Sequence, residues 1–115
     1  MCDLPASQAV FHWHGDTWDV PQGATLLASS AICPHQAFRF GSTTYGMQFH
    51  PEVTPGMIAD WCLQDENCGD VRELEAPIDA HRDAERLAQL AEVIFGRWCD
   101  LLLHSRAASS PVPAV

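Results

Sequence analysis

The chain contains no lysine, and its 115 residues carry six basic side chains, all arginine, against fifteen acidic ones. The formal net charge of -9 disfavours nucleic acid and anionic membranes as partners, because phosphate binding requires a clustered positive surface. No apolar run approaches the roughly 20 residues that a membrane span needs. The first five residues also lack the positive and apolar regions of a signal peptide. We therefore expect a cytoplasmic protein.

Motifs that pair cysteines are also missing from the sequence. The five cysteines form an odd set with no CxxC pair and no repeated spacing. Together with the missing export signal, this pattern favours reduced thiols over a disulfide framework. Cys62 and Cys68 flank the end of a predicted helix, but they lack the short spacing that is typical of zinc knuckles. We expect neither disulfides nor a structural metal.

Length and composition indicate one small folded domain. A chain of 115 residues is too short for two independent domains. Its 47% hydrophobic and 18% charged residues are typical of a globular protein and far from the composition of a disordered chain. Residues 107–115 are different, because small residues and two prolines offer little that could pack or form regular structure. We assign residues 1–106 to the domain and predict a disordered tail over 107–115.

The first half of the chain predicts short strands. Residues 25–29 are expected to form a short buried strand after a turn at residues 21–23. Residues 36–40 and 44–49 are rich in aromatic side chains. The Gly-Ser-Thr segment that joins them has the length and composition of a β-hairpin loop.

Two helices are predicted after the hairpin. Thr54 can cap a helix that begins at Pro55 and ends before Gly69. A second helix is expected from about Asp79, and it would carry His81 and His104. Its apolar residues recur at steps of three and four, which predicts a stripe that packs against a sheet. The stripe consists of Leu87, Leu90, Ala91, Ile94, Trp98, Leu101 and Leu102. Residues 9–14 can also be extended, and about four short strands with these two helices indicate an α/β fold with a thin sheet.

The residues with the most chemical information follow the second strand of the hairpin, where His50 and Glu52 are separated by a proline. Alternate residues of an extended chain point the same way, so the two side chains can converge. An imidazole can remove a proton from a nucleophile, and an adjacent carboxylate can fix its tautomer. The pair alone also fits an ordinary surface histidine beside a solvated acid.

The segment Gln48-Phe49-His50-Pro51-Glu52, followed by a helix that starts with Thr-Pro, resembles the last catalytic motif of class I, triad-type glutamine amidotransferases. Residues 11–21 are similar to the family's His-Gly-Asp loop before a Val-Pro turn, as in members like the amidotransferase part of GMP synthase. Residues 30–40 continue in the same order and spacing. The resemblance covers residues 4–65 well and residues 95–102 more loosely. It implies the C-terminal portion of a flavodoxin-like α/β domain.

The resemblance also implies an activity, the hydrolysis of glutamine to glutamate and ammonia through a glutamyl thioester on a Cys-His-Glu triad. His50 would act as base and then as acid, and Glu52 would orient it. Trp13, His14 and Gly15 would lie beside the bound glutamine. No cofactor is implied. The ammonia would pass to an acceptor reaction, supplied in this family by a synthase domain or subunit.

The family's nucleophile is a cysteine on a Gly-x-Cys-x-Gly turn between a strand and a helix. None of the cysteines of this sequence lies in such a turn: Cys2, Cys33, Cys62, Cys68 and Cys99. We therefore predict that the chain supplies the histidine and glutamate but lacks the nucleophile. Alone it should be inactive and marginally stable, oligomeric, or dependent on a missing N-terminal half or partner chain that carries the cysteine.

Two alternatives remain open from the residues. The chain could be a non-catalytic remnant that acts as a binding or regulatory module. A metal site is the other alternative, because a His-x-His pair on a strand can present both rings to one ion. It would use His12, His14, Cys33, His35 and His50. The family resemblance accounts for His14 and His50 without a metal.

Overall fold

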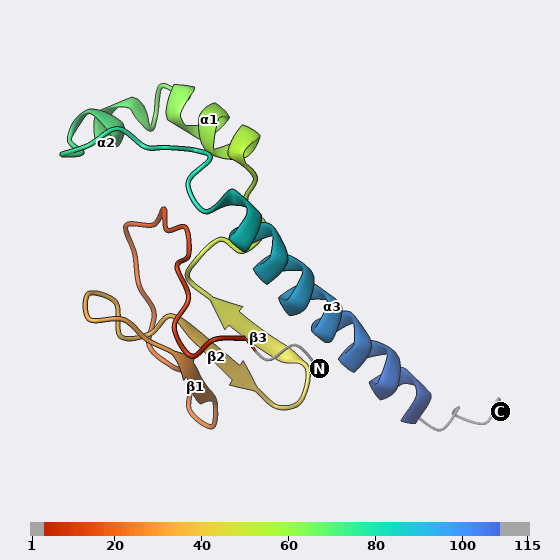
Figure 1. Cartoon of the computed structure of the whole chain (residues 1–115). Helices are drawn as coiled ribbons and strands as arrows, with labels where there is room; N and C mark the ends of the chain where they lie inside the picture. The colour runs from red at the N-terminus through yellow and green to blue at the C-terminus, as the bar shows by residue number, and fades with distance from the viewer. Residues whose placement is uncertain (1–3, 109–115) are drawn as a thin grey trace, which may run out of the picture.

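The computed structural model describes residues 4–108 and arranges them as three strands followed by three helices (Figure 1). The strands are β1 (Thr25–Ala28), β2 (Ala37–Phe40) and β3 (Thr44–Met47). The helices are α1 (Pro55–Leu63), α2 (Cys68–Arg72) and α3 (Ala84–Ala108). In Figure 1, α1 and α2 lie together at one end of the molecule, the sheet lies at the other, and the long helix α3 runs along one side. This is a small α/β arrangement.

The predicted hairpin is confirmed. Strands β2 and β3 are antiparallel neighbours, and the loop that joins them begins at Gly41 with a positive φ of 64°. Phe38 lies opposite Gly46 across the pair. A methyl group on Gly46 would overlap the Phe38 ring, so a larger residue at this position would displace that ring. The glycine therefore lets an aromatic side chain lie across the neighbouring strand.

Strand β1 forms close to the predicted position, but the expectation that it is buried is wrong. It is an edge strand that pairs with β2, with an irregularity between Leu26 and Ala28. Leu26 is 44% exposed and Leu27 is 51% exposed. Apolar residues predict burial only when another layer covers them, and within residues 4–108 no layer covers this strand.

Helix α1 follows the prediction closely. The Thr54 hydroxyl accepts a hydrogen bond from the Met57 amide at 3.2 Å, and Pro55 occupies the first turn, where its missing N–H is not needed. Ile58, on the inner face of α1, is only 3% exposed. Gly69 lies beyond the end of α1 as expected, but it belongs to the short helix α2, which the sequence did not predict.

Helix α3 begins at Ala84, several residues after the predicted start near Asp79. The difference has a local cause, because Asp83 has a φ of 57°, which a right-handed helix cannot contain. His81 therefore lies in the turn before the helix and not on it, whereas His104 is helical as expected. The helix extends to Ala108, so it includes the first two residues of the predicted tail. Residues 109–115 of that tail lie outside the described residues.

The apolar core is small and lies where the hairpin, the segment after it, α1 and the start of α3 meet. Its buried apolar members are 3% to 7% exposed: Ala37, Val53, Ile58, Leu87 and Leu90. The second half of the α3 stripe is less buried than predicted, since Trp98 and Leu101 are each 40% exposed, and Trp98 contacts the hairpin loop through a hydrogen bond of 2.8 Å from its Nε1 to the Thr43 carbonyl oxygen. Within residues 4–108, none of the helices combines the length and apolar character of a membrane span.

A wide groove separates the exposed part of α3 from the sheet. Its volume is about 1470 Å³, and Leu27 of β1, Tyr45 of β3 and Trp98 of α3 all line it. Gln36 also lines the groove; it is 4% exposed, and its side-chain oxygen lacks a hydrogen-bond partner. The Cα radius of gyration is 17.6 Å, compared with about 13 Å for a compact chain of about 100 residues. The arrangement of elements is therefore open.

Candidate catalytic site

His50 and Glu52 lie on the segment that leads from β3 to α1, and the backbone directs both side chains outward. Pro51 and Val53 are buried, so the residues that alternate with them face away from the core. The His50 amide also donates to the Phe11 carbonyl oxygen at 2.9 Å, which ties this segment to the N-terminal strand-like run. Sequence alternation and one long-range hydrogen bond therefore position the pair.

The two side chains make a direct contact. His50 Nδ1 lies 2.8 Å from Glu52 Oε1, with side-chain exposures of 30% and 45%. An ionised carboxylate can only accept a hydrogen bond, so Nδ1 carries the proton and donates it. In the neutral ring, Nε2 then keeps a lone pair that can accept a proton from another group. The geometry is that of a base oriented by a carboxylate.

Trp61 of α1 also contacts the His50 ring, which the sequence did not predict. The two ring centroids are 5.2 Å apart at an interplanar angle of 67°. The Trp61 ring is also 6.0 Å from Trp13, edge to face, and 6.1 Å from Phe11. The sequence pattern put Met57, Ile58, Trp61 and Cys62 on one face of the predicted helix, which indicates only packing for Trp61. Its position on the first helix after the histidine motif was the available signal.

The predicted substrate loop lies partly next to this pair. Trp13 reaches the site through Trp61. His14 Nδ1 donates to the Asp16 carbonyl oxygen at 2.7 Å, and its Nε2 lies 3.3 Å from His12 Nδ1. An added methyl group on Gly15 would meet no atom within 4 Å. The structure therefore brings Trp13 to the histidine and leaves His14 and Gly15 on an exposed loop.

His12 lies between this loop and the histidine of the pair. Partial burial, followed by the nearby His14 and His50 rings, holds the pKa of His12 below its ordinary value. Each effect disfavours a positive charge on His12. The ring is therefore poised to remain neutral over a wider pH range than a free histidine.

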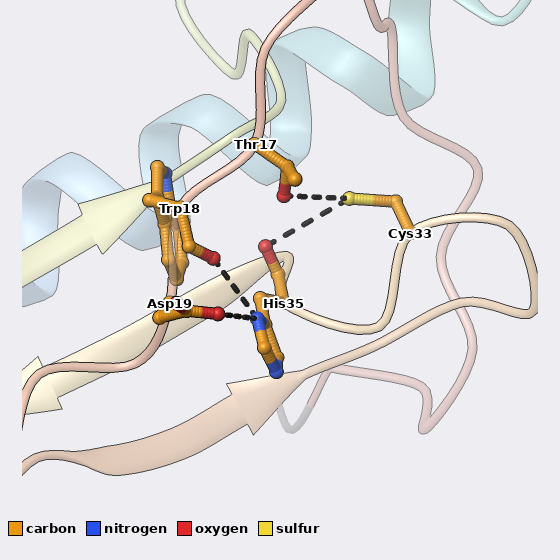
Figure 2. Close-up of polar contacts among 5 residues, drawn as sticks. All are labelled: Thr17, Trp18, Asp19, Cys33 and His35. Atoms are coloured by element: carbon orange, nitrogen blue, oxygen red, sulfur yellow. Dashed lines mark hydrogen bonds and ion pairs between the residues drawn. The ribbon is translucent and has the colours of Figure 1, made fainter.

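A second cluster of polar residues anchors the C-terminal end of the loop (Figure 2). His35 Nδ1 donates to the Trp18 carbonyl oxygen at 2.9 Å and lies 3.8 Å from Asp19 Oδ1. Cys33 Sγ lies 3.9 Å from both Thr17 Oγ1 and the His35 carbonyl oxygen. These contacts join residues 17–19 to the segment that enters β2, and they engage Cys33 in weak hydrogen bonds.

This second cluster bears on the metal alternative. Figure 2 shows Cys33 and His35 directed toward residues 17–19, whereas His12, His14 and His50 cluster around the loop and α1. In residues 4–108, no three histidine, cysteine or acidic side chains are arranged to hold a metal ion. The five proposed ligands therefore do not form one site.

The remaining cysteines lie on helices. Cys62, Cys68 and Cys99 belong to α1, α2 and α3, and Cys99 is exposed while the other two are half-buried. Cys2 falls outside the described residues. Across residues 4–108, each cysteine is on a helix or in the loop before β2, so none lies on a strand-to-helix turn.

Comparison with protein families places this site in a known context. The family model described as "Glutamine amidotransferase class-I" matches residues 1–66, which is more than half of the chain. GMP synthase [glutamine-hydrolyzing] of Bacillus pumilus is 49% identical over 53 residues, 44% of this chain and 10% of that protein. Gamma-glutamyl peptidase 3 of Arabidopsis thaliana is 41% identical over 57 residues, 49% of this chain and 23% of that protein.

Solved structures show the same relationship. The glutamine amidotransferase of Methylobacillus flagellatus matches with a TM-score of 0.67 and 26% identity, covering 80% of this chain and 42% of that one. A glutamine amidotransferase of Thermotoga maritima matches with a TM-score of 0.55 and 30% identity, covering 87% and 41%. The chain thus spans less than half the length of these relatives. On the family match and this shared fold, the chain belongs to the class-I glutamine amidotransferase family.

Proposed function

We propose that this chain supplies the histidine and glutamate of a glutamine-hydrolysing site, and that the nucleophilic cysteine comes from another segment or chain. The observation that supports the proposal is the 2.8 Å contact between His50 Nδ1 and Glu52 Oε1. It leaves Nε2 as the free base in the geometry that a Cys-His-Glu triad requires. The residues of this pair belong to the segment matched by the family model.

The chemistry needs one group that moves a proton twice. His50 Nε2 removes the proton from the thiol, and the thiolate attacks the side-chain amide carbon of glutamine. The imidazolium then gives its proton to the departing nitrogen, and ammonia leaves a glutamyl thioester. Water, deprotonated by the same Nε2, attacks the thioester and releases glutamate and the thiol. Glu52 stays ionised throughout and stabilises the imidazolium.

Glutamine recognition is assigned to the loop that carries Trp13, His14 and Gly15. The open space around Gly15 allows a ligand to approach the backbone closely. The contact of His14 with the Asp16 carbonyl oxygen fixes the turn of the loop. Backbone groups of this loop would contact the amino-acid end of glutamine, while its amide points to His50.

Two relatives indicate the class of substrate and the fate of the ammonia. A protein named as a glutamine-hydrolyzing GMP synthase and one named as a gamma-glutamyl peptidase are each similar to part of this chain. Glutamine and γ-glutamyl peptides share the same acyl group, so one site could act on either. We favour glutamine, with ammonia delivered to a synthase in the cytoplasm.

The groove between β1, β3 and α3 is the surface proposed to receive the cysteine-bearing half. Leu27 and Trp98, both in the groove, are 51% and 40% exposed, which is costly for an isolated fold. Gln36 also lines the groove, and its side-chain oxygen is buried without a hydrogen-bond partner among the described residues. The match covers 42% of the Methylobacillus flagellatus amidotransferase, so more than half of that chain has no counterpart here and is the proposed source of the occupant.

A complementation assay tests this function. The chain is co-expressed with the part of the Methylobacillus flagellatus amidotransferase that lies outside the match, and glutamate release is measured from glutamine and from a γ-glutamyl peptide. We expect hydrolysis by the assembly and none by either part alone, with the full-length relative as positive control. A stable complex without hydrolysis would favour the alternative, a non-catalytic binding or regulatory module. Substantial hydrolysis by the lone chain would refute the prediction that this chain lacks the nucleophile.

A further inference from the structure

We infer that Trp61 is a positioning residue that holds the His50 ring in the orientation in which Nδ1 faces Glu52. The inference rests on the proposed function for its catalytic meaning, but its physical content concerns this chain alone. A half-turn of the imidazole about the bond to its Cβ breaks the hydrogen bond at Nδ1, but the Glu52 side chain is 45% exposed and water can replace it as a partner, so this bond alone opposes the flip weakly. A second contact on the ring is needed to exclude the flipped orientation.

Trp61 provides the nearer of two aromatic contacts, since the Phe11 ring lies 6.4 Å from the imidazole. The Trp61 ring lies 5.2 Å from the imidazole at 67°, within the range in which aromatic pairs attract each other through their quadrupoles. The indole is half-buried on α1, and α1 is fixed at its start by the Thr54 cap. The side chain that restrains His50 is therefore attached to a rigid helix only eleven positions further along the chain. In contrast, Glu52 is 45% exposed and has fewer constraints of its own.

The same indole joins the base to the substrate loop. Trp61 is 6.0 Å from Trp13 at an interplanar angle of 89°, and Phe11 lies 6.1 Å from each of these tryptophans. Trp13 belongs to the loop assigned to glutamine binding. A ligand that moves Trp13 would therefore act on the ring that restrains His50. Trp61 thus sets the spacing between the loop and the base as well as the orientation of the base.

Nitrogen NMR of the imidazole tests the inference without any activity. In the wild-type chain at a pH where His50 is neutral, the ¹⁵N shifts should show the Nδ1–H tautomer as the main form. We expect Trp61→Leu to lower the ratio of Nδ1–H to Nε2–H tautomers about two- to tenfold, the range of an aromatic pair. Trp61→Phe, which keeps an aromatic ring, should restore most of that ratio.

The matched control is Leu63→Ala on the same helix, because Leu63 is 79% exposed. It should leave the tautomer ratio unchanged. An unchanged ratio in folded Trp61→Leu would overturn the inference. If Trp61→Leu fails to fold, the spectrum of the wild-type chain tests the inference. A mixture of the two tautomers with Trp61 present would also overturn the inference.

A kinetic test on the complemented assembly separates this inference from the proposed function. Trp61→Leu should lower kcat for glutamine more than Trp61→Phe does, with Leu63→Ala like the wild type. A tautomer change without any glutamine hydrolysis by the wild-type assembly would reject the function and keep the role of Trp61. Hydrolysis with equal kcat in wild type and Trp61→Leu would reject the role of Trp61 and keep the function.

Discussion

The His50 segment and the second half of α3 differ in how completely their contacts are made within this chain. His50 has a backbone hydrogen bond to Phe11, a carboxylate partner and an aromatic neighbour. On α3, Leu90 is 4% exposed, but Leu101, three turns later, is 40% exposed and lines an open groove. The first region makes its contacts within residues 4–108, whereas the second exposes much of its apolar face, although Trp98 Nε1 donates to the Thr43 carbonyl oxygen at 2.8 Å.

This difference separates a region whose contacts are complete within residues 4–108 from one whose apolar face is partly open. The His50–Glu52 pair is positioned by a strand end, a proline, the hydrogen bond to Phe11 and the helix that follows, all of which lie within residues 4–108. The apolar residues of the α3 stripe have the spacing of a helix that packs against another layer. In its second half, however, Trp98 and Leu101 are as exposed as residues at an interface. The proposed function thus joins a preformed catalytic half to an incomplete core.

The largest expected effect is the loss of glutamine hydrolysis when His50 is replaced. His50→Asn removes the base but keeps a polar side chain of similar size. Glutamine hydrolysis by the complemented assembly should fall about 10²- to 10⁴-fold, the usual contribution of a general acid and base. The measurement is steady-state glutamate release. Full activity in His50→Asn, with complex formation intact, would remove His50 from the mechanism.

The next prediction compares the loss of stability caused by truncating two leucines of α3. Leu90→Ala deletes a side chain that is 4% exposed and should lower the free energy of unfolding by about 2 kcal/mol or more. Leu103→Ala deletes one that is 63% exposed and should change it by less than about 0.5 kcal/mol. Urea denaturation of the lone chain gives both values. Equal effects would mean that the open part of α3 is packed in solution.

A smaller effect is expected at the start of α1. Thr54→Ala removes the hydroxyl that accepts from the Met57 amide, and it should cost about 1 kcal/mol of stability. Thr54→Ser keeps the acceptor and serves as the control. Thermal unfolding followed by circular dichroism can compare the three proteins. A similar midpoint for Thr54→Ala and Thr54→Ser would show that the cap contributes nothing measurable.

The smallest expected effect is a pH dependence at His12. Its folded pKa lies below its ordinary value, so the unfolded chain binds the proton more readily. Stability is therefore retained above about pH 6.5 and declines as the pH falls from there toward the folded pKa. His12→Gln should lose less stability than the wild type between about pH 7.5 and 5.5. Parallel urea midpoints across that range would contradict the lowered pKa.

Local signals explain why much of the fold was predictable. Thr54 before Pro55, and Gly41 between two aromatic runs, act through backbone conformation and nearby hydrogen bonds, and both features are observed. The predictions failed where the deciding factor was not local. Asp79 looked like a helix start, but the positive φ of Asp83 delayed the helix to Ala84. Leu26 and Leu27 looked buried, but no second layer covers them.

The candidate site divides in the same way. His50 and Glu52 were predictable as a pair because alternation along an extended segment brings side chains two residues apart together, and the structure places them 2.8 Å apart. Trp61 was not predictable as part of the site. Its apolar character is equally suited to a helix packing face, and only the path of α1 brings it against the imidazole.

The sequence by itself determined the family, the hairpin, the capped helix and the proximity of His50 to Glu52, because each depends on residues close in the chain. The tertiary structure decided that Phe11 holds the His50 backbone and that Trp61 restrains its ring. It also decided that Trp98 and Leu101 of α3 line an open groove. Burial and contacts between distant segments depend on the whole arrangement of the elements, and no local pattern encodes that arrangement.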